Sequence, residues 1–266
     1  MKTGNSWLRS AAVVAAGIVM TVLVISPAAH SRQKKKAVAT PTATLTPTAT
    51  PTPEVHVWDF DQDKAGAVPA GWKPLEGDWQ VIADPSAPSK PNTFGLPAGR
   101  LLKSLTSALE YYPMAIQTDP TEYSDFTLEA QFKSAGGRFD CSGGLIFRYV
   151  DDKNFYLLSA GCPSDYFALS RMTNGQLVSL KQSVVPTDKD TWYRLKVTVQ
   201  SGHFMCYDDD KMIFDFDEHK IAKGKVGLWA RDDSQAQFDD VKITVLAPDD
   251  SAASAAPAAP AASPSP

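Results

Sequence analysis

Strict alternation of apolar and polar residues is the feature that most constrains the fold of this chain. In the segment 192–199, Tyr193, Leu195 and Val197 alternate with polar or amphipathic residues, and the segment 126–133 alternates in the same way. Successive side chains of a β-strand point to opposite faces of the sheet, so both segments are predicted to be strands. Strands with one apolar and one polar face are typical of antiparallel sheets, whose outer face meets water.

Turn signals separate further short segments of strand character. Asn174-Gly175 lies between two such segments, and this dipeptide accepts positive φ at both turn positions, so we expect a two-residue hairpin. Asp209-Asp210 is expected to form a second hairpin turn. Many short strands with turns between them predict an all-β fold, a jelly-roll β-sandwich of two antiparallel sheets.

The two ends of the chain differ from the middle in composition. Residues 1–31 combine basic residues, the apolar run 11–25 and small residues, which is typical of a signal peptide or, if uncleaved, of a membrane anchor. Residues 32–53 are basic and then rich in Thr and Pro, and are predicted to be a linker. Residues 248–266 are predicted to be a disordered Ala/Pro/Ser tail, which leaves 54–247 as the folded domain. We expect an exported protein, secreted or held at the cell surface, that meets a membrane only through an uncleaved N-terminal segment.

Several sequence motifs recur in the order known from one group of proteins. The chain carries GLIFRYVD at 144–151, NFY at 154–156, GKVGLW at 224–229 and FDDV at 238–241, and it opens with WDFD at 58–61. This ordered set resembles concanavalin A-like jelly-roll domains, and it is most similar to the 3-keto-disaccharide hydrolase domain family, a neighbour of laminin-G-like and glucanase-like sandwiches. The resemblance implies the fold; lectins, hydrolases and adhesion modules all share it.

Three cysteines are too few for a fold built on disulfides, but two of them are placed to form one bridge. The apolar segments 143–150 and 154–160 are expected to pair as a hairpin, in which opposite residues have numbers that sum to about 303 to 305. Cys141 and Cys162 then meet at the open end of the hairpin. We predict a disulfide between them, with two free thiols or a metal pair as alternatives, and a buried thiol at Cys206.

Four residues are predicted to bind a ligand. Alternation places Arg148 on the opposite face of its strand from Phe147, where the guanidinium could hydrogen-bond sugar hydroxyls or a carboxylate; a structural ion pair is the alternative. Trp229 and Arg231 share a face by the same alternation, and Trp229 is expected to stack on a sugar ring or to lie in the core. Tyr156 is a lesser candidate of the same kind.

The acidic residues suggest a cofactor more than a catalytic pair. Asp59, Asp61 and Asp239 come from the first and last strands, which are expected to be neighbours, and their oxygens could hold a structural calcium ion; ordinary turn and edge carboxylates are the alternative. Apart from this calcium no cofactor is predicted. The chain lacks the E-x-D-x-E strand of laminarinase-type glucanases, so no catalytic residue is assigned.

These features leave three hypotheses for function. The first is a carbohydrate-binding or adhesion-type domain displayed on a flexible stalk, the second a hydrolase of glycosides or 3-keto-disaccharides, and the third a protein-interaction module of the cell surface. Carbohydrate is the partner expected under the first two. A formal net charge of −4 and the lack of a basic stripe in the domain argue against a nucleic-acid partner.

Overall fold

The computed structural model describes residues 52–89, 91–98, 111–162 and 164–247, and none of these ranges contains a helix. No helix in the described part of the chain is therefore long and apolar enough to cross a membrane. The predicted leader, most of the predicted linker and the predicted tail lie outside the described residues.

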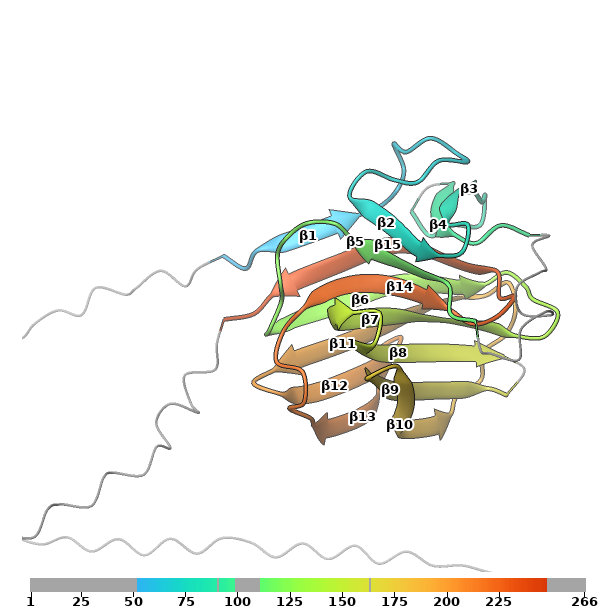
Figure 1. Ribbon diagram of the computed structural model, residues 1–266. Helices are drawn as coiled ribbons and strands as arrows, with labels where there is room; N and C mark the ends of the chain where they lie inside the picture. Colours follow the sequence, from blue (N-terminus) through green and yellow to red (C-terminus); the bar gives the residue numbers. More distant parts are fainter. Residues whose placement is uncertain (1–51, 90, 99–110, 163, 248–266) are drawn as a thin grey trace, which may run out of the picture. The chain divides into compact units, whose positions relative to one another are not determined.

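Within these ranges, fifteen strands form two sheets in which every pairing is antiparallel (Figure 1). The eight-stranded sheet contains, in spatial order, β13 (Lys211–Asp217), β12 (His203–Asp208), β11 (Trp192–Gln200), β6 (Phe126–Ser134), β15 (Ala236–Val245), β4 (Asn92–Gly95) and β3 (Gln80–Ala83), with β1 (Val55–Trp58) also paired to β15. The seven-stranded sheet contains β10 (Gln176–Val184), β9 (Tyr166–Thr173), β8 (Asn154–Cys162), β7 (Cys141–Asp151), β14 (Lys225–Ala230), β5 (Met114–Gln117) and β2 (Trp72–Glu76).

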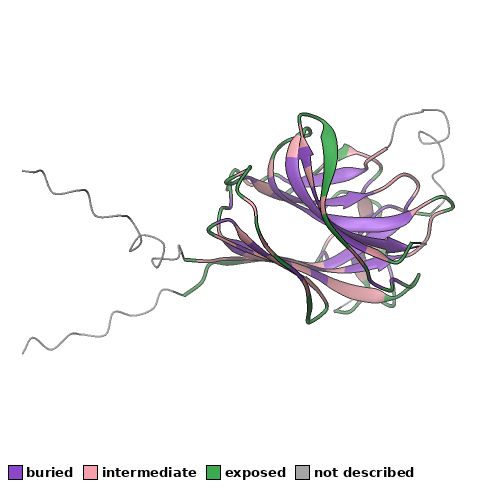
Figure 2. Cartoon of the chain, turned by 90° about the horizontal axis from the view of Figure 1, so that it is seen from below, coloured by how far each residue is buried: buried purple, intermediate pink, exposed green. Residues whose placement is uncertain are grey.

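The main core lies between the two sheets. Figure 2 shows the buried residues gathered in the facing layers. The alternation predicted for β11 is confirmed, because Leu195, Val197 and Val199 are fully buried while their neighbours in sequence are half-buried. In β6, Phe126 and Phe132 are buried by the same alternation. The prediction of an all-β sandwich is thus confirmed. Burying large apolar side chains of this kind stabilises a fold by about 1.5–3 kcal/mol each.

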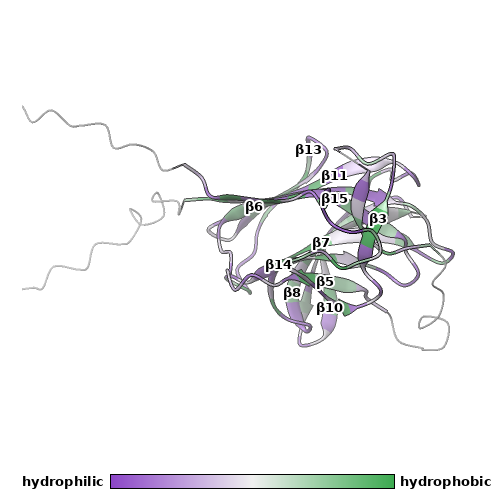
Figure 3. Cartoon of the chain, turned by 90° about the horizontal axis from the view of Figure 1, so that it is seen from above, coloured by the Kyte–Doolittle hydropathy of each residue, from purple (hydrophilic) through white to green (hydrophobic). Residues whose placement is uncertain are grey.

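A second, smaller apolar cluster covers the outer face of the seven-stranded sheet. Leu228 packs in the main core whereas its neighbour Trp229 packs in the second cluster, and Leu158 and Leu157 divide in the same way. The remaining members of the second cluster are Met114, Ile116, Ile146, Phe155 and Met172, with Tyr112 and Tyr149 packed against them. Figure 3 shows the two sheets as separate layers, with β5, β8, β10 and β14 together in one of them. This sheet is therefore apolar on both faces, as predicted for its central strands.

The predicted turns and pairings are present. Asn174 and Gly175 both have positive φ, 51° and 79°, and join β9 to β10, while a turn at Asp209 joins β12 to β13. Cys141 and Cys162 lie opposite each other in the ladder between β7 and β8, and a disulfide joins them with their Cα atoms 5.3 Å apart.

Candidate functional site

A cavity of about 270 Å³ opens on the outer face of the seven-stranded sheet. It is lined by Tyr112, Asp140, Leu157, Ser159, Cys162, Ser164, Tyr166, Ala168, Ser170, Leu177, Ser179, Gln182, Trp229 and Arg231. Small side chains on the central strands make this hollow, because Ser159 on β8 lies directly opposite Ala168 on β9. Trp229 of β14 and Gln182 of β10 lie at the two ends of this row of small residues.

One end of the cavity carries a carboxylate and a guanidinium. The Oδ2 atom of Asp140 lies 3.8 Å from Nε of Arg231. The Oδ1 atom of Asp140 accepts hydrogen bonds from the hydroxyls of Ser142 and, at 3.3 Å, Ser234. Burial raises the pKa of Asp140 above its ordinary value, although the Ser142 hydroxyl and the Arg231 charge act in the opposite direction. The cavity therefore holds a paired but desolvated carboxylate at its wall.

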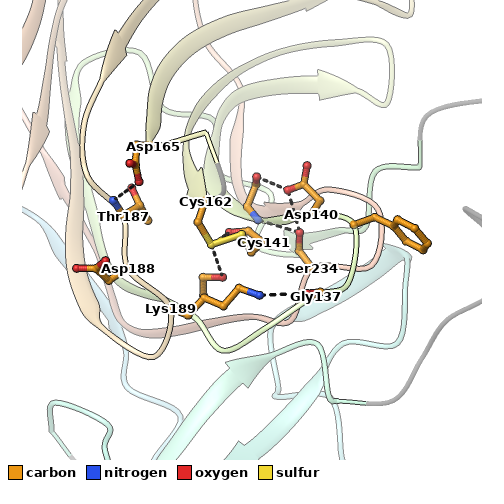
Figure 4. Close-up of a disulfide and its surroundings, with 12 residues drawn as sticks. Gly137, Asp140, Cys141, Cys162, Asp165, Thr187, Asp188, Lys189 and Ser234 are labelled. Atoms are coloured by element: carbon orange, nitrogen blue, oxygen red, sulfur yellow. Dashed lines mark hydrogen bonds between the residues drawn. A yellow bond between two sulfur atoms is a disulfide. The ribbon is translucent and has the colours of Figure 1, made fainter.

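The backbone around Asp140 is held in place from several directions. The carboxylate of Asp233 accepts hydrogen bonds from three consecutive backbone N–H groups, those of Arg138 (2.7 Å), Phe139 (3.0 Å) and Asp140 (3.0 Å). The next residue, Cys141, is tied to β8 by the disulfide. Figure 4 shows Asp140 and Ser234 beside this disulfide. Constraints on both sides of Asp140 limit the positions that its side chain can take.

Aromatic side chains form the rest of this end of the cavity. The rings of Tyr112 and Trp229 lie 5.8 Å apart, and Trp229 is only 3% exposed. Burial raises the pKa of Tyr166 above its ordinary value, and the charge of Asp140 adds to the effect. Trp229 packs in the second apolar cluster, the core position that was the alternative to stacking on a sugar, and it lines the same space as Tyr112, Tyr166 and the hydrogen-bonding groups.

Two of the predicted site residues lie elsewhere. The guanidinium of Arg148 points between the sheets, 5.3 Å from the ring centre of Phe204, and donates to the carbonyls of Ile221 and Ser124, both at 2.8 Å. The prediction that Arg148 faces away from Phe147 is wrong, because a β-bulge with a positive φ of 47° at Arg148 shifts the alternation by one residue.

Tyr156 is also inside the sandwich. Its ring is fully buried against Phe147 and Phe204. Its hydroxyl donates to Glu218 at 3.0 Å and accepts from the backbone N–H of Ile221 at 3.2 Å. Burial raises the pKa of Tyr156 to about 12. Tyr156 thus fastens the loop after β13 to the seven-stranded sheet, and it is not part of the cavity wall.

The three carboxylates predicted to hold calcium do not form a grouped metal site in the described residues. β1 and β15 are neighbours as expected, but among the described residues no group of acidic, His or Cys side chains could hold a metal. Asp239 is fully buried, and its two oxygens accept hydrogen bonds from Ser89 (3.1 Å) and the backbone N–H of Asp240 (2.8 Å). Each oxygen of Asp239 thus accepts one hydrogen bond from the protein.

Comparison with known protein families shows which family this chain belongs to. The model of the 3-keto-alpha-glucoside-1,2-lyase-like domain matches residues 66–244, well over half of the 266 residues. The chain belongs to this family. The resemblance predicted from the sequence motifs is thereby confirmed for the 3-keto-alpha-glucoside-1,2-lyase-like domain. No curated protein matches the chain.

Solved structures share the fold of this 3-keto-alpha-glucoside-1,2-lyase-like domain. The carbohydrate-binding module CBM66 from Bacillus subtilis is 23% identical with a TM-score of 0.53, over 65% of this chain and 94% of the module. The exoplasmic/lumenal domain of VIP36 in its Ca²⁺-bound form is 13% identical with a TM-score of 0.50, over 72% of this chain and 90% of that one. Both likenesses show the jelly-roll fold.

The cavity of the 3-keto-alpha-glucoside-1,2-lyase-like domain contains two of the four residues predicted to bind a ligand. Trp229 and Arg231 line it together. Sequence reasoning missed Tyr112, Asp140 and Tyr166, although alternation through β7 places Asp140 on the same face as Ile146 and could have indicated it.

Proposed function

We propose that the cavity on the outer face of the seven-stranded sheet binds carbohydrate. The observation that carries this proposal is the meeting of Trp229 and Tyr166 with the Asp140–Arg231 pair in one hollow. A sugar ring has an apolar C–H face that packs on aromatic rings, and its hydroxyls both donate to carboxylates and accept from guanidinium groups. Binding sites that combine an apolar lining with a few placed polar groups are typical of small-molecule recognition.

The relatives support the same class of ligand. CBM66 is a carbohydrate-binding module, and the name of the family refers to 3-keto-α-glucosides. We therefore expect α-glucosides, with or without a ketone at C3, to be the first ligands worth testing. The shared fold alone does not select a sugar, since this sandwich hosts several activities.

We further propose that the domain is exported and displayed on its N-terminal segment. The leader-like pattern of residues 1–31 and the Thr/Pro-rich segment that follows support export, and so does the disulfide, which persists in oxidising compartments. Both ends of the described chain lie near one end of β15, where Val55 pairs with Thr244. Ser234, which donates a hydrogen bond to Asp140 in the cavity wall, lies just before the other end of β15. A strand of that length spans about 30 Å, so the cavity would lie at the far end of the domain from the point of attachment.

Titration calorimetry with a panel of glycans tests carbohydrate binding. The matched variants are Arg231→Gln in the cavity and Arg194→Gln on the other sheet, two partly exposed arginines that each contact a carboxylate. Loss of a charged hydrogen bond is worth about 1.5–3 kcal/mol, so Arg231→Gln should weaken binding about tenfold or more while Arg194→Gln binds like the wild type. Failure of the wild type to bind any glycan, or equal binding by Arg231→Gln, would contradict the proposal.

A second candidate function, lyase activity, is favoured by the raised pKa of Asp140. In a 3-keto-α-glucoside the ketone acidifies the proton at C2. A carboxylate base can take that proton as the C1–C2 double bond forms, the bond from C1 to the glycosidic oxygen breaks, and the departing oxygen gains a proton. Wild-type protein that releases the aglycone from a 3-keto-α-glucoside, with Asp140→Asn binding but inactive, would establish this activity. Release by Asp140→Asn at the wild-type rate would remove Asp140 from that role.

A further inference from the structure

The cavity continues as a trough that runs across the strands. Strand pairing places Trp229 opposite Gly144, Gly144 opposite Ser159, Ser159 opposite Ala168 and Ala168 opposite Gln182. Between the indole of β14 and the amide of β10, the three central strands thus carry only Gly, Ser and Ala. Neighbouring strands lie about 4.8 Å apart, so the row from β14 to β10 is about 19 Å long.

Glycine at one point of this row has no room for a side chain. A Cβ atom added at Gly144 would meet the carbonyl oxygen of Leu158 at 2.4 Å and the Cα atom of Ser159 at 3.0 Å. Both contacts are with backbone atoms, which cannot move aside cheaply. The floor of the trough is therefore flat at β7, because the backbone of β8 leaves no room for a side chain at this position.

The far half of the trough is polar. Leu157, Ser170 and Ser179 form a parallel row beside the first, and Ser170 is buried at its bottom. Within the described part of the chain, the side chains of Ser170, Ser179 and Gln182 have no hydrogen-bond partner. The hydroxyl of Ser170 reaches the open space of the trough, where water or a ligand can be its hydrogen-bond partner.

The trough is open at the edge of the sheet. β10 is the last strand of its sheet and pairs only with β9. Leu177, on the cavity side of this strand, is 37% exposed. A molecule held at Trp229 can therefore extend over β8, β9 and β10 and leave across the edge without meeting a wall.

From this shape, and on the basis of the proposed function, we infer that the site takes a chain of several sugars, not a single ring. One ring lies at the aromatic and charged end beside Trp229 and Arg231, and the following rings lie over the Ser and Ala residues of β8 and β9. Ser170, Ser179 and Gln182 hydrogen-bond their hydroxyls. Affinity should then rise with chain length until the chain passes β10.

Two substitutions on neighbouring residues of β10 test this inference. Ser179→Trp fills the far half of the trough, whereas Val178→Trp places the same side chain on the other face of the same edge strand. Both positions are exposed, so neither change disturbs the core. Titration calorimetry would compare methyl α-glucoside with malto- and cello-oligosaccharides of increasing length, on the wild type and on both variants.

We expect the longer oligosaccharides to bind the wild type about tenfold or more tightly than the monosaccharide, which corresponds to one additional hydrogen-bonded or stacked ring. Ser179→Trp should abolish this gain, and Val178→Trp should behave as the wild type. Equal affinity of the wild type for short and long sugars would overturn the inference while leaving the proposed function in place. Absence of binding to every sugar would overturn both.

Discussion

Reduction of the disulfide between Cys141 and Cys162 is expected to lower the free energy of unfolding by about 3 kcal/mol. The two residues are separated by 21 positions, and closing a loop of that size in the unfolded chain removes conformational entropy of about that value at 25 °C. With an m-value of about 2 kcal/mol/M, the urea midpoint should fall by about 1.5 M.

The assay is urea unfolding followed by tryptophan fluorescence and circular dichroism, with and without a phosphine reductant. The double variant Cys141→Ala/Cys162→Ala controls for other effects of the reductant, because its midpoint should not respond to it. Cys206 is buried and has no disulfide partner, so it does not contribute to the change. An unchanged midpoint in wild-type protein that has been shown to be reduced would refute the reasoning.

Three further changes probe the described contacts. Lys133→Met leaves the buried carboxylate of Asp84 without its cation and should cost about 3 kcal/mol in urea unfolding. Tyr156→Phe removes the hydroxyl that donates to Glu218, and the midpoint should report a loss of about 1.5 kcal/mol. Burial raises the pKa of Asp239 to about 6 from 3.8, so the unfolded chain releases this proton first and stability falls as pH rises between these values. Asp239→Asn should reduce that fall in unfolding curves measured across this pH range, while Asp208, whose pKa burial also raises to about 6, maintains the rest. A decline that persists unchanged would exclude Asp239 as a source.

Pairing of the central hairpin could be predicted from the sequence because it depends on two local features, the apolar segments and the short turn between them. Partner numbers sum to 303 at Cys141 and Cys162 and to 305 at Asp151 and Asn154, the two limits of the expected range. The sum changes because a β-bulge between Phe147 and Asp151 shifts the pairing of the two strands. The same bulge made the prediction for Arg148 wrong, since a positive φ at a non-glycine residue depends on the tertiary contacts that hold it.

The candidate site was only partly predictable for a related reason. Trp229 and Arg231 lie two positions apart on one strand and its continuation, so alternation was enough to place them together. Asp140, just before β7, and Tyr166, at the start of β9, line the same cavity as these two residues. Asp140 is held there by Asp233, in the turn after β14, which accepts a hydrogen bond from its backbone N–H. Such a meeting depends on which strands are neighbours in the sheet, and alternation within one strand carries no information about that.

The pairing of β1 with β15 also decides how the domain responds to mechanical force. Val55 and Thr244 are opposite each other at the same end of an antiparallel pair, so both ends of the described chain emerge side by side. Tension applied between them would peel the two strands apart one hydrogen bond at a time, which is the geometry of least resistance. Tension between a tether at the N-terminal side of β1, as proposed above, and a ligand held in the trough would instead act along β1 and β15, so that the bonds of this pair share the load. Under the proposed N-terminal tether, a ligand in the trough would thus load this pair in its stronger direction.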